Sequence, residues 1–170
     1  CLDLKERPVS WADALREIDS IGWSYVPSLH EFVYDGTGIG EIRHLGGKPV
    51  VKASKCMDFG GYAVPESFIV TPETEFKGTF LVEAERGCPR GCRFCAAGFL
   101  YLPPRWREAQ AVKDSVNRGL AATGKVALVG TAVSEYPDIK ETVRLAIEAG
   151  GSMTLSSLRL DRLDSEFLGL

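Results

Sequence analysis

Residues 79–95 read TFLVEAERGCPRGCRFC, an apolar run that leads straight into three closely spaced cysteines. The first part, residues 79–84, is typical of a β-strand. Cys88, Cys92 and Cys95 follow it with the spacing Cys-x3-Cys-x2-Cys. Three thiolates are one fewer than a structural zinc site or a fully ligated four-iron cluster takes. The pattern therefore predicts a metal centre with one open coordination position, where chemistry can take place.

The loop itself suits a tight turn around a metal. Gly87 and Gly91 allow sharp backbone turns, and Pro89 stiffens one of them. Thiolate is a soft ligand that suits iron–sulfur clusters and zinc. The remaining cysteines and both histidines are distant in the sequence, and nothing marks any of them as a fourth ligand: Cys1, Cys56, His30 and His44.

Composition sets broad limits on the function. The chain has 170 residues, 45% hydrophobic and 25% charged, which is enough for one domain with a real core. Its net charge of −3 argues against a nucleic-acid groove that works by bulk charge, but it does not exclude nucleic acid as a partner. Arginines crowd the cysteine loop and indicate either a solvated loop or charge compensation for an anionic cluster or a substrate phosphate: Arg86, Arg90, Arg93, Arg105 and Arg107.

Cysteine usage and hydropathy indicate the compartment. No run approaches the ~20 apolar residues of a membrane span, and residues 1–12 do not read as a signal peptide. The 5 cysteines are an odd number, and their clustering does not suit a disulfide framework, so we expect a cytoplasmic protein with no membrane partner. Because the chain begins at Cys1 and residues 164–170 read as a helix that stops in its first turn, we also expect a piece of a longer polypeptide.

Two regions differ in their pattern of elements. Residues 1–70 read as a small α+β lead-in, with a helix capped by Ser10 and closed near Gly22. A β-hairpin, a short strand and an irregular connector follow it, at residues 31–34 with 41–45, 49–53 and 55–78.

From residue 71 to residue 170, strands alternate with helices. Strands are predicted at 79–84, 126–130 and 153–156, and helices at 108–122, at 138–149 and from 164. Such repeats form an α/β fold with a parallel sheet and right-handed crossovers. Chemistry in these sheets gathers at the carboxyl ends of the strands, where the cysteine loop is expected to lie.

The cysteine motif, with Phe94 next to its last cysteine, resembles the cluster motif of the radical S-adenosylmethionine (SAM) enzymes. The resemblance covers residues 79–170, about the first half of that family's partial (β/α)6 barrel. It implies a parallel (β/α) partial barrel, truncated to its first half and preceded by the lead-in. The substrate-facing half of the barrel is absent from this chain, so the substrate stays unknown.

The resemblance also implies a mechanism. Cys88, Cys92 and Cys95 would hold three irons of a 4Fe–4S cluster, and the fourth iron would chelate the amine and carboxylate of SAM. An electron, supplied by a donor such as flavodoxin or ferredoxin, would cleave the C–S bond of SAM. The products would be methionine and a 5′-deoxyadenosyl radical, which takes a hydrogen atom from the substrate.

Further cofactor-binding roles are implied residue by residue. Phe94 would give backbone contact to the adenine. Gly130 and Thr131 stand where the family has a glycine pair that receives the methionine amine, and Glu135 lies later than the family's glutamate.

After the third strand, Ser156, Ser157 and Arg159 would meet the ribose hydroxyls or the carboxylate of SAM. The alternative for Arg159 is a surface ion pair with Asp161 or Asp164.

A narrower likeness concerns the subgroup of radical SAM enzymes that carries an upstream cobalamin-binding domain. Residues 70–107, 22–29 and 156–163 resemble segments of that subgroup. The likeness implies cobalamin bound by a domain outside this chain, and methyl transfer as the reaction. This chain itself has no Asp-x-His-x-x-Gly cobalamin motif.

Two other functions stay open. A zinc-binding interaction module would need a fourth ligand from Cys56 or from a partner, because structural zinc takes four ligands. An electron-transfer or structural iron–sulfur domain would keep the cluster but never cleave a cofactor.

Overall fold

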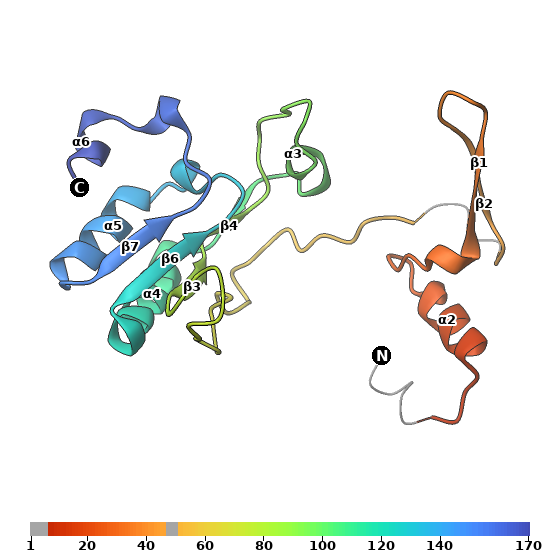
Figure 1. The fold of residues 1–170 in the computed structure, drawn as a ribbon, viewed down its shortest axis with the longest axis horizontal. Coiled ribbons are helices and arrows are strands. Elements are labelled where there is room, and N and C mark those ends of the chain that lie inside the picture. The colour runs from red at the N-terminus through yellow and green to blue at the C-terminus, as the bar shows by residue number, and fades with distance from the viewer. Residues whose placement is uncertain (1–6, 47–50) are drawn as a thin grey trace. The chain divides into compact units, whose positions relative to one another are not determined.

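The computed structural model describes residues 7–46 and 51–170, and they form two compact units. The units are residues 1–56 and residues 57–170 (Figure 1). Cys1 and the first two residues of the predicted strand at 49–53 lie outside the described part, and residues 51–53 form no strand. Within the described residues, no helix is both long enough and apolar enough to cross a membrane.

The N-terminal unit consists of a helix and a hairpin. Helix α2 (Trp11–Ser20) begins where the Ser10 side chain accepts a hydrogen bond from the Asp13 amide, the capping role that the sequence predicts. A short 3-10 helix, η1 (Pro27–Leu29), leads into strands β1 (His30–Tyr34) and β2 (Ile39–His44). The two strands pair antiparallel, so the predicted hairpin is confirmed.

Three parallel strands form the sheet of the second unit. They are β3 (Phe80–Glu83), β6 (Lys125–Val129) and β7 (Ser152–Leu155), in the order β3-β6-β7. Helices α4 (Ala109–Thr123) and α5 (Ile139–Glu148) connect successive strands and pack against the sheet and each other (Figure 1). The prediction of a mixed α/β fold with a parallel sheet is confirmed at this level.

The sequence places the ends of these helices for identifiable reasons. Glu108 caps α4 by accepting a hydrogen bond from the Ala111 amide, and Gly124 ends the helix with a left-handed φ of 67°. The apolar faces of both helices then bury Val112, Val116 and Val143 against the strands. The core of this unit therefore lies between the sheet and the two helices.

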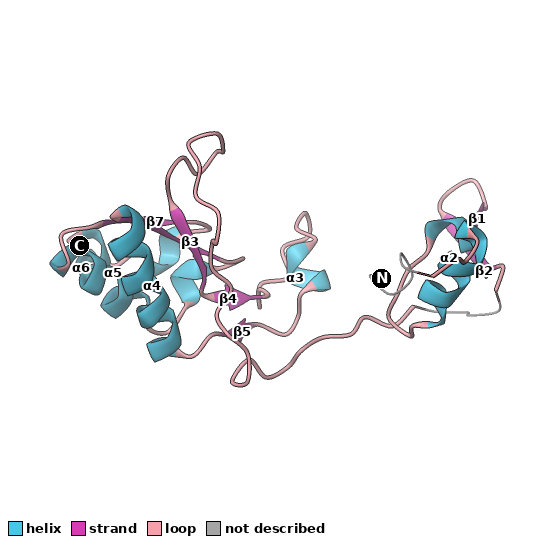
Figure 2. Cartoon of the chain, turned by 90° about the horizontal axis from the view of Figure 1, so that it is seen from below, coloured by secondary structure: helices cyan, strands magenta, loops and turns pink. Residues whose placement is uncertain are grey.

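A long loop leaves the sheet between β3 and α4. Its base is a second pair of strands, β4 (Glu85–Arg86) and β5 (Arg105–Trp106), which are antiparallel. The loop carries the three cysteines and a single-turn helix, α3 (Ala97–Leu100). Figure 2 shows α3 within this loop. Two 3-10 helices follow β6 and β7, namely η2 (Val133–Glu135) and η3 (Leu160–Arg162), and the chain ends with α6 (Ser165–Leu168).

Residues 57–70, which the sequence assigns to the lead-in, belong to the second unit. Glu66 bridges Val82 of strand β3, and the Glu83 amide donates to the Pro65 carbonyl at 2.9 Å. The connector thus covers the outer edge of β3, which would otherwise expose unpaired backbone groups.

Candidate metal and cofactor site

The cysteine loop leaves the carboxyl end of β3 and is closed where β4 meets β5. Gly87 lies where the two ends of the loop approach most closely, and its φ is 90°. A Cβ atom at Gly87 would lie 2.8 Å from the Pro103 carbonyl oxygen and still closer to that of Tyr101. Only glycine fits there, because both obstacles are backbone atoms and the conformation is left-handed. The loop is therefore pinned at its base, on the edge where the sequence predicts it.

The three cysteines in this loop are free thiols, each partly exposed. Within residues 7–46 and 51–170, no three or more His, Cys, Asp or Glu side chains stand close enough together to hold a metal ion. The thiols are thus not preassembled as a ligand set. Their chemistry nevertheless fits an iron–sulfur cluster or zinc, because three soft donors share one short loop with a fixed base.

Residues predicted from the two following strands meet beside this loop. The Ser157 hydroxyl donates to the Gly130 carbonyl at 3.1 Å, and the Ser156 hydroxyl donates to the Leu128 carbonyl at 3.2 Å. Ser157 has a φ of 53°, a left-handed conformation that turns the chain sharply after β7. The structure therefore brings Gly130 and both serines together at the carboxyl edge of the sheet.

Glu135 is the centre of a charged cluster on the same edge. Its Oε1 accepts a hydrogen bond from Arg90 Nε at 2.8 Å and lies 3.3 Å from Arg159 Nε and 3.7 Å from Arg162 Nε. Only 10% of the Glu135 side chain is exposed. Because Arg90 stands between Cys88 and Cys92, this ion pair ties the cysteine loop to the segment after β6.

Arg159 also forms the ion pair that the sequence offers as its alternative. Its Nη2 lies 2.8 Å from Asp161 Oδ2. The Asp161 carboxylate raises the pKa of Arg159, and Glu135 and the Cys92 thiol add to this effect. Arg159 is therefore within electrostatic reach of the cysteine loop although it pairs with a surface carboxylate.

Phe94 is exposed over 93% of its surface and projects from the loop. A role for its backbone at a bound adenine stays a prediction, because backbone contact does not depend on where the ring points.

Glu85 is a buried carboxylate that the sequence reading missed. It is 2% exposed, and its Oε1 accepts a hydrogen bond from the Ala132 amide at 2.6 Å. Thr131 Oγ1 lies 3.2 Å from Oε2. Burial raises the pKa of Glu85, while the hydrogen bonds from Ala132 and Thr131 oppose that rise. Glu85 therefore holds the turn after β6 in which two predicted cofactor-binding residues lie.

Gly130 makes room for this carboxylate. A Cβ at residue 130 would lie 2.9 Å from Glu85 Cδ and closer still to Oε1. The sequence shows a glutamate at residue 85, directly after the predicted strand and before the cysteines, but only the fold shows which backbone amide it accepts from.

A buried arginine contacts the residues at the base of the cysteine loop. Arg107 Nε donates to Glu83 Oε1 at 2.9 Å, and its guanidinium lies 3.9 Å from the centre of the Phe59 ring. Arg86 and Arg105, at the base of the loop, lie over the same ring at 5.9 and 5.3 Å. Three of the five arginines that crowd the cysteines therefore act on the base of the loop through cation–π contacts.

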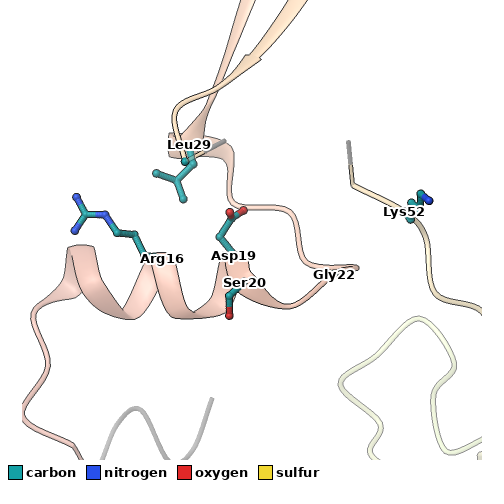
Figure 3. A pocket seen from close by; sticks show the side chains of 7 residues that line it. Arg16, Asp19, Ser20, Gly22, Leu29 and Lys52 are labelled. Carbon is teal, nitrogen blue, oxygen red and sulfur yellow. The ribbon is translucent and has the colours of Figure 1, made fainter. Parts of the chain in front are cut away.

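The N-terminal unit has a pocket of its own, of about 500 Å³, which holds none of the predicted site residues. In Figure 3, Asp19 points toward Leu29, whereas Ser20 points away from it. Asp19 Oδ2 lies 2.9 Å from His44 Nε2, and both side chains are almost completely buried. Asp19, which lines the pocket, therefore also joins α2 to the hairpin through this buried contact.

Comparison with known proteins finds a partial likeness to an uncharacterized protein. No family model matches the chain. Over 98 residues the chain is 36% identical to an uncharacterized protein of Methanocaldococcus jannaschii. The match covers 56% of this chain and 22% of the relative, so the chain spans about a fifth of the relative's length.

Proposed function

We propose that this chain is the cluster-binding part of a radical SAM enzyme, with Cys88, Cys92 and Cys95 as ligands of a 4Fe–4S cluster. The observation that carries the proposal is where the cysteine loop lies. It leaves the first strand of a parallel sheet at its carboxyl end, and Arg90 within it contacts Glu135 after the second strand. In parallel α/β sheets this edge is where cofactors bind.

The bound cluster would supply one electron to cleave the C–S bond of SAM, giving methionine and a 5′-deoxyadenosyl radical. The residues of the chain position the cofactor. Glu135 supplies a carboxylate for the methionine amine. Ser156 and Ser157 donate their hydroxyl protons to backbone carbonyls, so their oxygens stay free to accept hydrogen bonds from the ribose. Phe94 and the turn at Gly130 and Thr131 supply backbone contacts.

The proposal includes the remainder of a longer protein. The three parallel strands would be the first half of a partial barrel, and the helix and hairpin before residue 57 would join it to an upstream domain. We propose that this domain binds cobalamin, that the reaction is a methyl transfer, and that a flavodoxin or ferredoxin supplies electrons. The chain accounts for only 22% of its relative's length, which leaves room for such parts.

Anaerobic reconstitution with iron and sulfide tests the proposal. We expect the protein to take up about four irons and to show the broad visible absorption of a cluster. On reduction with SAM, the full-length protein should form 5′-deoxyadenosine. Cys92→Ala should abolish both cluster formation and 5′-deoxyadenosine formation. Cys56→Ala, which removes an exposed cysteine outside the loop, should abolish neither of them.

The same preparation separates the other two functions. A colourless protein that binds zinc would replace the proposal with a zinc-binding module. A cluster that forms but never yields 5′-deoxyadenosine would leave an electron-transfer or structural domain. Retention of the cluster in Cys92→Ala would refute the ligand assignment.

A further inference from the structure

The cluster around Glu135 carries more positive than negative charge. Three guanidiniums, those of Arg90, Arg159 and Arg162, face the same carboxylate oxygen. Asp161 is the second carboxylate in the cluster and pairs with Arg159. Three cations against two anions leave one positive charge uncompensated among these side chains, which favours an added anion.

Arg162 is the cation with donors to spare. Its Nε lies 3.7 Å from Glu135 Oε1, too far for a hydrogen bond, and its side chain is 52% exposed. No other acceptor within the described residues takes a hydrogen bond from it. Its guanidinium therefore offers N–H groups to a ligand, in the planar arrangement that suits carboxylates and phosphates.

Three members of this cluster, Arg90, Glu135 and Arg162, line a pocket of about 480 Å³ between the cysteine loop and the segments after β6 and β7. Its walls are Pro89, Arg90, Pro104, Trp106, Ser134, Glu135 and Arg162. The volume lies within the range of small-molecule sites. Trp106, at the base of the loop, is 44% exposed and lines the pocket together with Pro89 and Pro104, so the lining includes an aromatic ring and two apolar prolines.

We propose that this pocket binds an oxyanion carried on a flat ring, with Arg162 and Arg90 on the anion and Trp106 against the ring. A ring stacked on an indole gains contact area and polarisation, and the guanidiniums supply charge-assisted hydrogen bonds. The oxyanion is either the phosphate of a nucleotide or an aromatic carboxylate. That this ligand is a substrate rests on the proposed function, whereas the binding itself does not.

Calorimetric titration of the iron-free protein tests the proposal with two matched pairs of probes. Adenosine 5′-monophosphate is compared with adenosine, and benzoate with benzamide. We expect one of the two anions to bind at least about tenfold more tightly than its neutral partner, since a charge-assisted hydrogen bond has about this effect. The pair of probes in which the anion binds more tightly shows whether the oxyanion is a nucleotide phosphate or an aromatic carboxylate.

Two variants locate the site. Arg162→Gln should weaken binding of that anion about tenfold, and Trp106→Leu should weaken it to a similar extent. Arg118→Gln removes an exposed arginine of α4 that does not line the pocket, so it should leave the affinity unchanged. The proposal would be overturned if neither anion bound, or if each anion bound no more tightly than its neutral partner. It would also be overturned if Arg162→Gln and Arg118→Gln changed the anion affinity equally.

Iron uptake separates this proposal from the proposed function. Arg162→Gln should still take up iron and sulfide, because Arg162 is not a cluster ligand. If the protein takes up no iron but Arg162→Gln still weakens anion binding, the proposed function fails and the anion site stands.

Discussion

At the scale of single residues, Glu85 links the first strand of the sheet to the predicted cofactor site. Its carboxylate is almost fully buried and accepts from the Ala132 amide, so it acts on Gly130 and Thr131 through the backbone. We regard it as a positioning residue because it touches the turn and not a ligand. A glutamate just after a strand and next to an arginine is usually solvent-exposed, which is why the sequence pattern alone did not single it out.

The raised pKa of Glu85 predicts a pH-dependent effect of Glu85→Gln. A carboxyl whose folded pKa lies above its ordinary value of 4.5 contributes stability that is present below that value and lost as pH rises through the folded pKa. The glutamine can still accept from Ala132 but does not ionise. The free energy of unfolding of the variant relative to the wild type should therefore increase between about pH 4 and about pH 7.

Urea unfolding of both proteins at the two pH values measures this difference. Carboxyls with lowered pKa values, such as Glu66 beside Arg118, act in the opposite direction but are common to both proteins and cancel. A relative stability that stays constant or decreases across the range would show that ionisation of Glu85 is not penalised by folding.

At the scale of elements, hydrophobic period and capping predicted the parallel sheet and its helices closely. Glu108, Asp138 and Asp164 stand at the N-caps of α4, α5 and α6, where the sequence placed helix starts. The strands β4 and β5 were not predicted, because two-residue strands carry no period. They depend on the close approach of Gly87 to residues 101–103, a contact between distant parts of the loop that no local pattern reports.

The candidate site also combines features that the sequence predicted with features that it did not. The sequence supplied the cysteines and the residues after the second and third strands, because chemistry and strand order fix the edge on which they lie. It did not supply the convergence of Arg90, Arg159 and Arg162 on Glu135, since those four residues come from three separate loops. Side-chain direction at loop ends is set by tertiary contacts and has no sequence period.

Packing of α4 on the sheet gives a prediction at this scale. A Cβ at Gly119 would lie 2.5 Å from Phe80 Cδ1 and 2.8 Å from Val126 Cγ2, both in the core. Overpacking costs about 1–3 kcal/mol, whereas alanine gains about 1 kcal/mol of helix propensity over glycine. Gly119→Ala should therefore lower the free energy of unfolding by about 1 kcal/mol.

The control lies on the same helix. Asn117 is exposed, so Asn117→Ala should gain a few tenths of a kcal/mol from propensity, roughly as in peptides. Urea denaturation of both variants measures whether each substitution raises or lowers the free energy of unfolding. If Gly119→Ala were as stable as Asn117→Ala, α4 would not approach β3 and β6 as closely as the structure has it.

At the scale of the whole molecule, the two units differ in how much apolar surface they bury. The main core runs from Val64 to Ala146 and lies entirely within residues 57–170. In the described part of the first unit, only two apolar residues are buried, Ala14 and Val26. Small units with so little buried apolar surface are marginally stable by themselves, whereas the second unit has a sheet covered by two helices.

We therefore expect residues 57–170, produced alone, to fold and to unfold cooperatively at the same temperature as the main transition of the whole chain. Residues 1–56, produced alone, should show no cooperative transition, because their core is too small to offset the entropy of ordering the chain. Circular dichroism melts of the three proteins measure both outcomes. A large fall in the melting temperature of residues 57–170 would mean that the first unit stabilises the sheet directly, and the cysteine loop would then depend on both units.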